Sequence, residues 1–284
     1  LEFLKGDFPT NNDLFQGIDT SWSRIEGGTP IGAILYKVQK NFNFKDPSES
    51  IPQLLKAYNL IKKLPEGFWK ERKLKAITQL ISDCAGLYLE AVASEQTTTP
   101  KGSIKVTTEV VNRSSISMKL NSISSPIIQF PSQLVATHLK PNKKETMESV
   151  ESTFSATRFT APYWLNEKGS LGMYKVSDKN LIGLPEEETQ FPVSFNLSIE
   201  GTQISIVKNI IYKFNDPVKG EVYRPFQVLP DATSSIQEKV LIFATSEAKQ
   251  IPVKVRAGRD GISGSVSLQH PKGWVVSPSQ HIFS

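Results

Sequence analysis

A chain of 284 residues, 38% of them hydrophobic, is long enough for about two domains with buried cores. It contains no run of about 18 apolar residues, which excludes a membrane-spanning helix. The net charge of +5 suggests a nucleic-acid partner, but the lysines are dispersed, and their densest groups lack interleaved aromatic residues and any nucleic-acid-binding motif. We therefore expect no nucleic-acid partner. The densest groups are Lys70, Arg72, Lys73 and Lys75, and Lys140, Lys143 and Lys144.

The single cysteine and the first residues limit the class of protein further. Cys84 excludes an intramolecular disulfide and a cysteine metal cluster, and its apolar helical position predicts a core residue. Residues 1–7 have neither the basic start nor the apolar stretch of a signal peptide, and the sequence begins without Met. We expect an excised or mature segment of a longer protein, whose compartment the sequence leaves open.

Residues 1–96 predict a helical segment after an irregular lead-in. Apolar residues recur there at helical spacing in three stripes, and the short connections between them predict antiparallel helical packing. The stripes are Ile31, Ile34, Leu35, Val38 and Phe42; Ile51, Leu54, Leu55, Tyr58 and Ile61; and Leu74, Ile77, Ile81, Cys84, Tyr88 and Ala91.

The polar segment 95–102 ends the helical periodicity, and we place a domain boundary there. Apolar and polar residues alternate from Ile104 and again from Phe191, which predicts strands. A turn at residues 200–202 joins the second run to a partner strand, so we expect a long hairpin. Residues 97–230 thus predict an immunoglobulin-like antiparallel β-sandwich, with an insert at about 158–185.

Residues 231–284 predict the start of a second β-sandwich. Val266 and Leu268 alternate with polar residues, and a turn at residues 271–273 leads into Trp274 and Val276, which indicates an opening hairpin. Such a sandwich takes about 100 residues, so we expect this module to be truncated. The expected fold class is therefore multidomain α + β: a helical segment, an immunoglobulin-like antiparallel β-sandwich and a partial second β-sandwich.

The sequence offers no constellation of catalytic residues. His138, His270 and His281 lack metal-ligand spacing, and we expect turn or surface roles for them. No G-x-S-x-G elbow occurs, and Cys84 has no suggestive partner. We expect no catalytic residue, no metal ligand and no cofactor in this chain.

Two segments contain candidate binding residues. In the lead-in, Trp22 and Arg24 lie beside the carboxylates of Asp19 and Glu26, and this group could bind a polar ligand or dock against another domain, with capping and packing as the alternative. We name Trp22, Arg24 and Glu26 as candidate docking residues. In the insert, three aromatic residues could form a platform for the apolar faces of sugar rings, or could close the end of the sandwich. These are Tyr163, Trp164 and Tyr174.

Five phrases of the sequence are characteristic: L-F-x-G-I-D-T-S-W-S-R-I-E-G-G (14–28), T-A-P-Y-W-L (160–165), G-M-Y-K-V (172–176), L-I-G-L-P (181–185) and D-P-V-K-G-E-V-Y-R-P-F (216–226). Together they resemble the region downstream of the catalytic domain in large LmbE-like (PIG-L) N-acetylglucosamine deacetylases of Bacteroidetes-type bacteria. The resemblance runs over the whole chain, and P-K-G-W-V-V-S-P at 271–278 looks like the start of sandwich modules that accompany carbohydrate-active enzymes.

The resemblance implies a function for the parent protein rather than a catalytic site here. The family's A-H-P-D-D-E-type zinc motif and its further histidine ligand do not occur in this sequence, so no catalytic position can be carried over. The implied parent removes an N-acetyl group from an amino sugar with a zinc-bound water. This chain would be its non-catalytic accessory region, with the catalytic domain near Trp22 and an amino-sugar glycan as partners. The alternatives are an autonomous carbohydrate-binding module and an enzyme in its own right.

Overall fold

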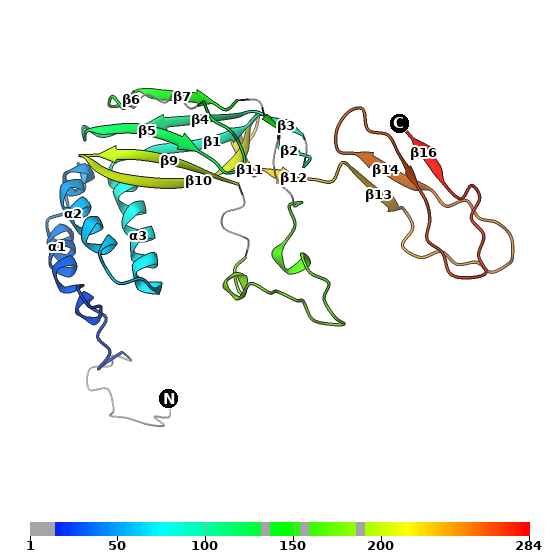
Figure 1. Ribbon diagram of the computed structural model, residues 1–284, viewed down its shortest axis with the longest axis horizontal. Helices are drawn as coiled ribbons and strands as arrows, with labels where there is room; N and C mark the ends of the chain where they lie inside the picture. The colour runs from blue at the N-terminus through cyan, green and yellow to red at the C-terminus, as the bar shows by residue number, and fades with distance from the viewer. Residues whose placement is uncertain (1–14, 101, 132–136, 151, 154–158, 186–190) are drawn as a thin grey trace.

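The computed structural model of the protein describes all residues except 1–14, 101, 132–136, 151, 154–158 and 186–190. Its described part consists of three α-helices, a curled β-sheet and a C-terminal segment of short hairpins (Figure 1). Strand residues outnumber helical ones, so the fold is mostly β, with the helices preceding the sheet.

The helices are α1 (Thr29–Lys40), α2 (Ile51–Lys62) and α3 (Phe68–Cys84), with short 3-10 turns η1 (Trp22–Arg24) and η2 (Pro47–Ser50) before α1 and α2. Prolines in the first turns of α1 and α2 fit there because an N–H at that position has no partner within the helix. Helix α2 packs against both α1 and α3. The first two predicted stripes are confirmed as helices. The buried residues of α2 are Ile51, Leu54, Leu55, Ala57, Tyr58 and Ile61.

The predicted third helix is too long. Helix α3 ends at Cys84, and Gly86 then takes a positive φ of 55°, which favours glycine and turns the chain away from the helix axis. Tyr88–Ala93 is strand β1, not the last turns of a helix. Its pairing with strands on both sides outweighs a spacing in which Tyr88 and Ala91 also fit a helical stripe.

The sheet has the strand order β6-β5-β9-β10-β1-β4-β7, and β11 also pairs with β10. It is mixed rather than antiparallel as predicted, because β1 runs parallel to β10. The remaining strands of this sheet pair antiparallel. Their bounds are β4 Val106–Val111, β5 Met118–Ser124, β6 Thr137–His138, β7 Lys144–Glu148, β9 Pro192–Ile199, β10 Thr202–Asp216 and β11 Gly220–Pro225.

The predicted long hairpin is confirmed as β9 and β10. Ile199 pairs with Thr202, and the two turn residues between them, Glu200 and Gly201, both have positive φ angles (46° and 79°). Two such residues make the turn whose twist matches that of the flanking strands. On β9 every second side chain is buried, and the alternate ones, such as Ser194 and Asn196, are partly exposed.

One continuous cluster of buried apolar side chains extends from the helices into the sheet. Ile31 and Ile81 of the helices and Phe195 and Ile210 of the strands belong to it. Within the segment expected to separate two domains, the short strand β2 (Thr97–Thr98) pairs with β12 (Gln227–Val228), and Val228 is fully buried. A further short pair is formed by β3 (Ser103–Ile104) and β8 (Ser152–Thr153).

The C-terminal segment contains two separate strand pairs. One consists of β13 (Ala232–Ile236) and β14 (Val253–Ala257), and the other of β15 (Gly264–Val266) and β16 (His281–Phe283). The predicted opening hairpin is therefore wrong in its register, because β15 pairs with β16, and residues 267–280 form no strand. No residue from 229 to 284 is buried.

The predicted insert begins at Arg158, which lies outside the described residues. From residue 159 to 185 the chain forms loops with two short 3-10 turns, η3 (Tyr163–Leu165) and η4 (Lys179–Leu181), as expected for loop-like sequence. The insert extends away from the sheet (Figure 1).

Removal of residues 231–284 is expected to change the free energy of unfolding of the remaining chain by no more than about 0.5 kcal/mol, because this segment contributes no buried side chain. Urea unfolding followed by circular dichroism measures the effect. The matched control removes residues 226–284, including buried Phe226 and Val228, and should cost at least about 3 kcal/mol. Equal losses of unfolding free energy in the two truncations would contradict the conclusion that residues 231–284 add nothing to the buried core.

Candidate functional site

The lead-in before α1 is organised by Asp19. One carboxylate oxygen accepts hydrogen bonds from the backbone N–H of Ser21 (2.8 Å) and from its hydroxyl (2.6 Å), and the other accepts from the Ser23 hydroxyl (2.8 Å). These hydrogen bonds, led by that of the Ser21 hydroxyl, lower the pKa of the Asp19 carboxyl. The carboxylate thus fixes the turn that carries Trp22 and Arg24.

Trp22 lies against the first turns of α1, and two glycines make this close approach possible. A Cβ atom on Gly32 would lie 2.9 Å from the Cβ of Trp22, and one on Gly28 would lie 2.0 Å from the Trp22 carbonyl oxygen. A side chain at position 32 would displace the Trp22 side chain, and one at position 28 would displace the backbone of the turn that carries it. Trp22 is partly buried and packs on the helical core.

Two cations and a second tryptophan complete the cluster. The Arg24 guanidinium lies 5.3 Å from the ring centre of Trp69, and Lys73 Nζ lies 5.2 Å from that of Trp22 and 5.8 Å from that of Trp69. Cations at this distance are attracted by the negative face of an aromatic ring. A cleft of about 60 Å³ opens among these side chains. We call Trp22, Arg24, Trp69 and Lys73 the tryptophan cleft.

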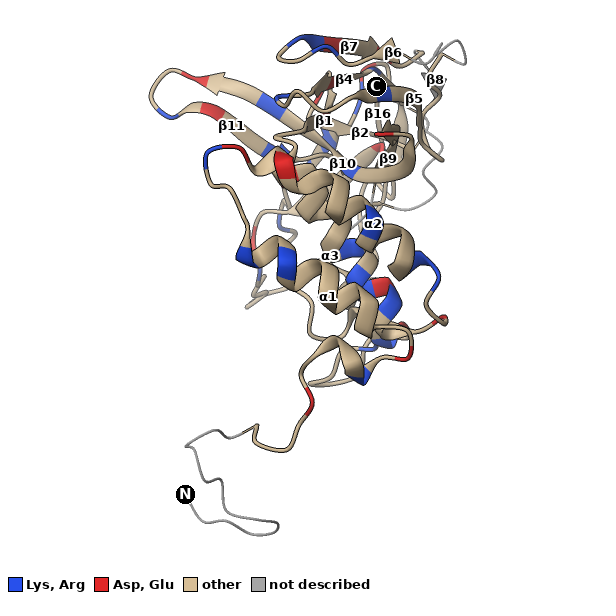
Figure 2. Ribbon diagram, turned by 90° about the vertical axis from the view of Figure 1, so that its left-hand side faces the viewer, with Lys and Arg blue, Asp and Glu red and all other residues tan. Residues whose placement is uncertain are grey.

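The structure brings together two of the three predicted docking residues. Trp22 and Arg24 belong to the tryptophan cleft, whereas Glu26 is exposed and does not line it. Sequence reasoning missed Trp69 and Lys73, although they lie four residues apart in the first turns of α3 and thus on one helical face. Figure 2 shows that lysines and arginines occur on all three helices, so position beside tryptophan, not charge density, distinguishes Lys73.

The three aromatic residues of the insert do not share a flat face. Tyr163 and Trp164 meet edge to face, with ring centres 4.9 Å apart and planes at 86°, and the Tyr163 hydroxyl donates to the Leu184 carbonyl at 2.9 Å. Tyr174 is 68% exposed. A single planar platform made by all three rings is therefore absent from this arrangement, and Tyr174 is the ring that is open to a ligand.

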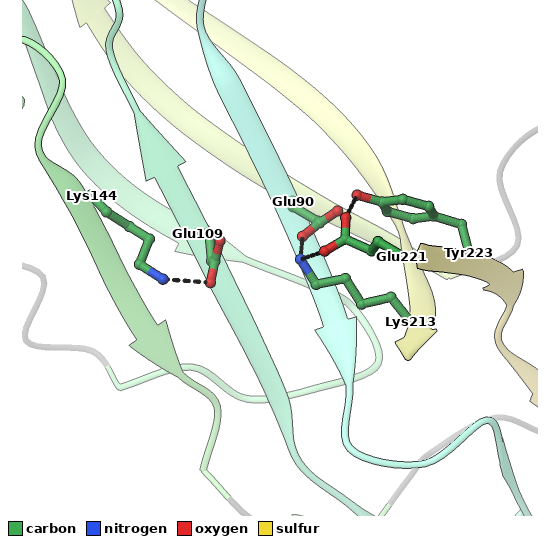
Figure 3. A network of polar contacts seen from close by, with 6 residues as sticks. All are labelled: Glu90, Glu109, Lys144, Lys213, Glu221 and Tyr223. Atoms are coloured by element: carbon green, nitrogen blue, oxygen red, sulfur yellow. Dashed lines mark hydrogen bonds and ion pairs between the residues drawn. The ribbon is translucent and has the colours of Figure 1, made fainter. Parts of the chain in front are cut away.

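A second polar cluster, which the sequence did not indicate, crosses the outer face of the sheet (Figure 3). Lys213 Nζ on β10 lies 2.5 Å from a carboxylate oxygen of Glu90 on β1 and 3.7 Å from one of Glu221 on β11. The Tyr223 hydroxyl donates to Glu221. The Glu90 side chain is only 7% exposed, so this ion pair is largely removed from water.

Tyr88, Tyr223 and Lys213, which lie in or beside this cluster, have raised pKa values. Burial, together with the hydrogen bond and charge of Glu90, raises the pKa of Tyr88 to about 12. The hydrogen bond to Glu221, with burial, raises the pKa of Tyr223. Burial lowers the pKa of Lys213, but the hydrogen bond and charge of Glu90 outweigh it, and the net shift is upward. None of these groups is poised to exchange a proton near pH 7, which general acid-base catalysis requires.

The three histidines lie in separate places, on β6, in the loop at residue 270 and on β16. Among the described residues, no group of three or more His, Cys, Asp or Glu side chains has an arrangement that could hold a metal ion. None of the helices in this part of the chain has the length and apolar character that crossing a membrane requires.

Stability is expected to fall as the pH rises from about 10 to about 12, because the folded chain keeps the Tyr88 proton over that range and the unfolded chain releases it. The raised pKa of Lys213 acts in the same direction above its ordinary value of 10.5. Tyr88→Phe should flatten this alkaline loss, and Tyr36→Phe, a change at an exposed position on α1, should not. Urea unfolding across this pH range provides the measurement, and an unchanged slope in Tyr88→Phe would refute the assignment.

The comparisons with known proteins leave the family open. The chain matches no protein-family model and no curated protein. It is weakly similar to the solved structure of the Pseudomonas fluorescens alkylpurine DNA glycosylase AlkC bound to DNA containing an abasic site analog, with 8% sequence identity and a TM-score of 0.21. That match covers 62% of this chain and 50% of the glycosylase chain, and at this TM-score it supports no conclusion about fold or function.

Proposed function

We propose that this chain is a non-catalytic accessory region of a larger carbohydrate-active enzyme, a zinc-dependent N-acetylglucosamine deacetylase, and that it holds and orients the catalytic domain. The observation that carries the proposal is the tryptophan cleft, in which two aromatic rings and two cations gather at the entry to the helical layer. Zinc and the hydrolytic step belong to the catalytic domain, and no step of the reaction is assigned to residues of this chain.

The composition of the cleft supports a docking role. Tryptophan and arginine are the residues most enriched among those that dominate binding energy at protein interfaces. Trp69 is 39% exposed, so its ring offers apolar surface that a partner could cover. The cations already lie over the rings, so little side-chain freedom remains to be lost when a partner binds.

As part of this proposal, we interpret the sheet as an immunoglobulin-like β-sandwich whose two layers share one strand. Strand β10 pairs with β9 over its first half and with β1 and β11 over its second half, and the sheet curls around the apolar side chains of its inner face. The alternation of buried and partly exposed residues on β9 and β4 is that of a strand in such a layer. Residues 231–284 would then be the first strands of a second module.

The gene that encodes this chain gives the first test. An A-H-P-D-D-E-type motif is expected in the same open reading frame, upstream of Leu1, because the proposed partner domain precedes this region in the family it resembles. Sequencing the full reading frame decides the matter, and the absence of any such motif would refute the deacetylase assignment.

Charge reversal in the cleft is expected to weaken binding to the catalytic domain. Arg24→Glu should raise the dissociation constant of the isolated chain for the separately purified catalytic domain at least about tenfold, since the loss of one charged interface contact exceeds about 1.4 kcal/mol. Isothermal titration calorimetry measures it. Lys37→Glu, the same charge reversal at an exposed position of α1 outside the cleft, is the control. Equal affinities of the two variants would contradict docking at the cleft.

A glycan contact by the insert is the second candidate function, and the exposed ring of Tyr174 is the observation that favours it. Tyr174→Ala should weaken retardation of the chain in gels containing chitosan, because sugar rings stack on such a ring, by about tenfold in affinity. Tyr36→Ala changes an exposed tyrosine on α1 and should have no effect. Equal migration of the wild-type chain with and without chitosan would remove this candidate.

A further inference from the structure

An apolar groove opens in the helical layer, apart from the tryptophan cleft. It has a volume of about 380 Å³, and its lining residues come from all three helices and from the loop after α1. Phe42 and Phe44 form one wall, with ring centres 5.0 Å apart and planes at 84°, and Phe44 is 87% exposed. A ring held by its neighbour but open to water gains from being covered. The other lining residues are Leu35, Val38, Gln39, Leu54, Leu80 and Cys84.

One stripe of α3 connects this groove with the tryptophan cleft. Trp69 and Lys73 line the cleft, and Leu80 and Cys84 line the groove. Steps of three and four residues through exposed Ala76 place all five on one face of the helix. Lys73 and Leu80 are two helical turns apart, about 10 Å along the axis. Because the side chain of Ala76 is only a methyl group, it obstructs little of the helix surface between the two hollows.

The two ends of this stripe differ in charge. Arg24 and Lys73 belong to the lining of the cleft, and no carboxylate lines either hollow. Glu26 and Glu71, the acidic residues nearest in sequence to Arg24 and Lys73, are exposed and line neither hollow. Asp19 already accepts hydrogen bonds from Ser21 and Ser23, and Asp83 accepts one from Gln79 at 2.7 Å. The surface thus offers two cations about two turns away from an apolar hollow, which is complementary to a ligand with an anionic head and an apolar tail.

We propose that the face between α1 and α3 binds an amphiphile that carries a carboxylate head and an unbranched acyl chain. The carboxylate lies at Lys73 and Arg24, and the acyl chain runs past Ala76 into the groove beside Leu80 and Phe44. The size of the groove decides between this ligand and a partner helix. A volume of 380 Å³ falls in the range of small-molecule pockets, whereas a helix about 10 Å across would fit only a few of its side chains there. This proposal does not rest on the docking function.

Cys84 provides a direct probe, because it is the only cysteine of the chain and it lines the groove. Burial, with the charge of Asp83, raises the pKa of its thiol, so alkylation by iodoacetamide is slow and can be followed by intact mass. Dodecanoate, below its critical micelle concentration, is expected to slow alkylation of the full chain about tenfold at saturation, because its acyl chain covers the sulfur. Dodecyltrimethylammonium has the same chain with a cationic head and should protect at least about tenfold more weakly.

Variants at Lys73, which is partly buried, and at exposed Phe44 separate the two ends of the site. Lys73→Met should raise the dodecanoate concentration for half-protection about tenfold. Lys37→Met makes the same change at an exposed position of α1 that lines neither hollow, and it should leave this concentration unchanged. Phe44→Ser should reduce protection by dodecanoate about tenfold, and Val218→Ser, at an exposed apolar side chain in the turn after β10, should not. Thermal unfolding of each variant shows whether its fold is retained.

Three outcomes would overturn the proposal. Equal protection by the anionic and cationic amphiphiles would show that the cations take no part. Unchanged protection in Phe44→Ser would place the acyl chain elsewhere. Protection by a synthetic acidic amphipathic helix of Leu and Glu, without protection by dodecanoate, would show that the groove takes a protein helix instead. Failure of the chain to bind a catalytic domain would leave all of these measurements unaffected.

Discussion

Pairing of β10 with three other strands connects the helical layer to the sheet. A strand of 15 residues exposes two long rows of backbone donors and acceptors, which need partners wherever water is excluded. The first half of β10 pairs with β9, and the second half pairs with β1 and β11. Because β1 follows α3 after only a short turn, its pairing with β10 fixes the end of α3 beside the sheet. The buried isoleucines of β10, Ile204, Ile206 and Ile210, join the same core as the helices.

The binding surfaces of the helical layer result from how α2 is buried. Because α2 packs against both of its neighbours, α1 and α3 flank it and present further faces to solvent. At one end of the gap between them, Gly28 and Gly32 let Trp22 approach α1, and the tryptophan cleft forms. Toward the other end, Phe42 and Phe44 wall an apolar groove. The same packing thus produces a cationic end and an apolar end on one face.

The ion pairs of the sheet fix the geometry of its strands more than they add to its stability. Removing Glu90 and Lys213 from water costs free energy that their attraction only partly returns, so the pair is weak evidence for added stability. Its geometry instead joins β1 to β10 across the outer face, where Lys144 of β7 and Glu109 of β4 form a similar pair at 3.0 Å. The groups of the Glu90 cluster for which a pKa shift is resolved stay protonated at neutral pH.

Local pattern determined the first two helices, the β9–β10 hairpin and the candidate pair Trp22 and Arg24, because helical spacing, strand alternation and a Glu-Gly turn act over a few residues. Long-range contacts decided what the pattern left ambiguous. Tyr88 and Ala91 suit a helical stripe as well as a strand, and pairing of β1 with β4 on one side and with β10, more than 100 residues later, on the other selects the strand. Trp69 and Lys73 meet Trp22 and Arg24 only because α3 lies beside the lead-in, and this contact has no local signature in the sequence. A residue's partners across the fold depend on packing between distant segments, which one sequence does not encode locally.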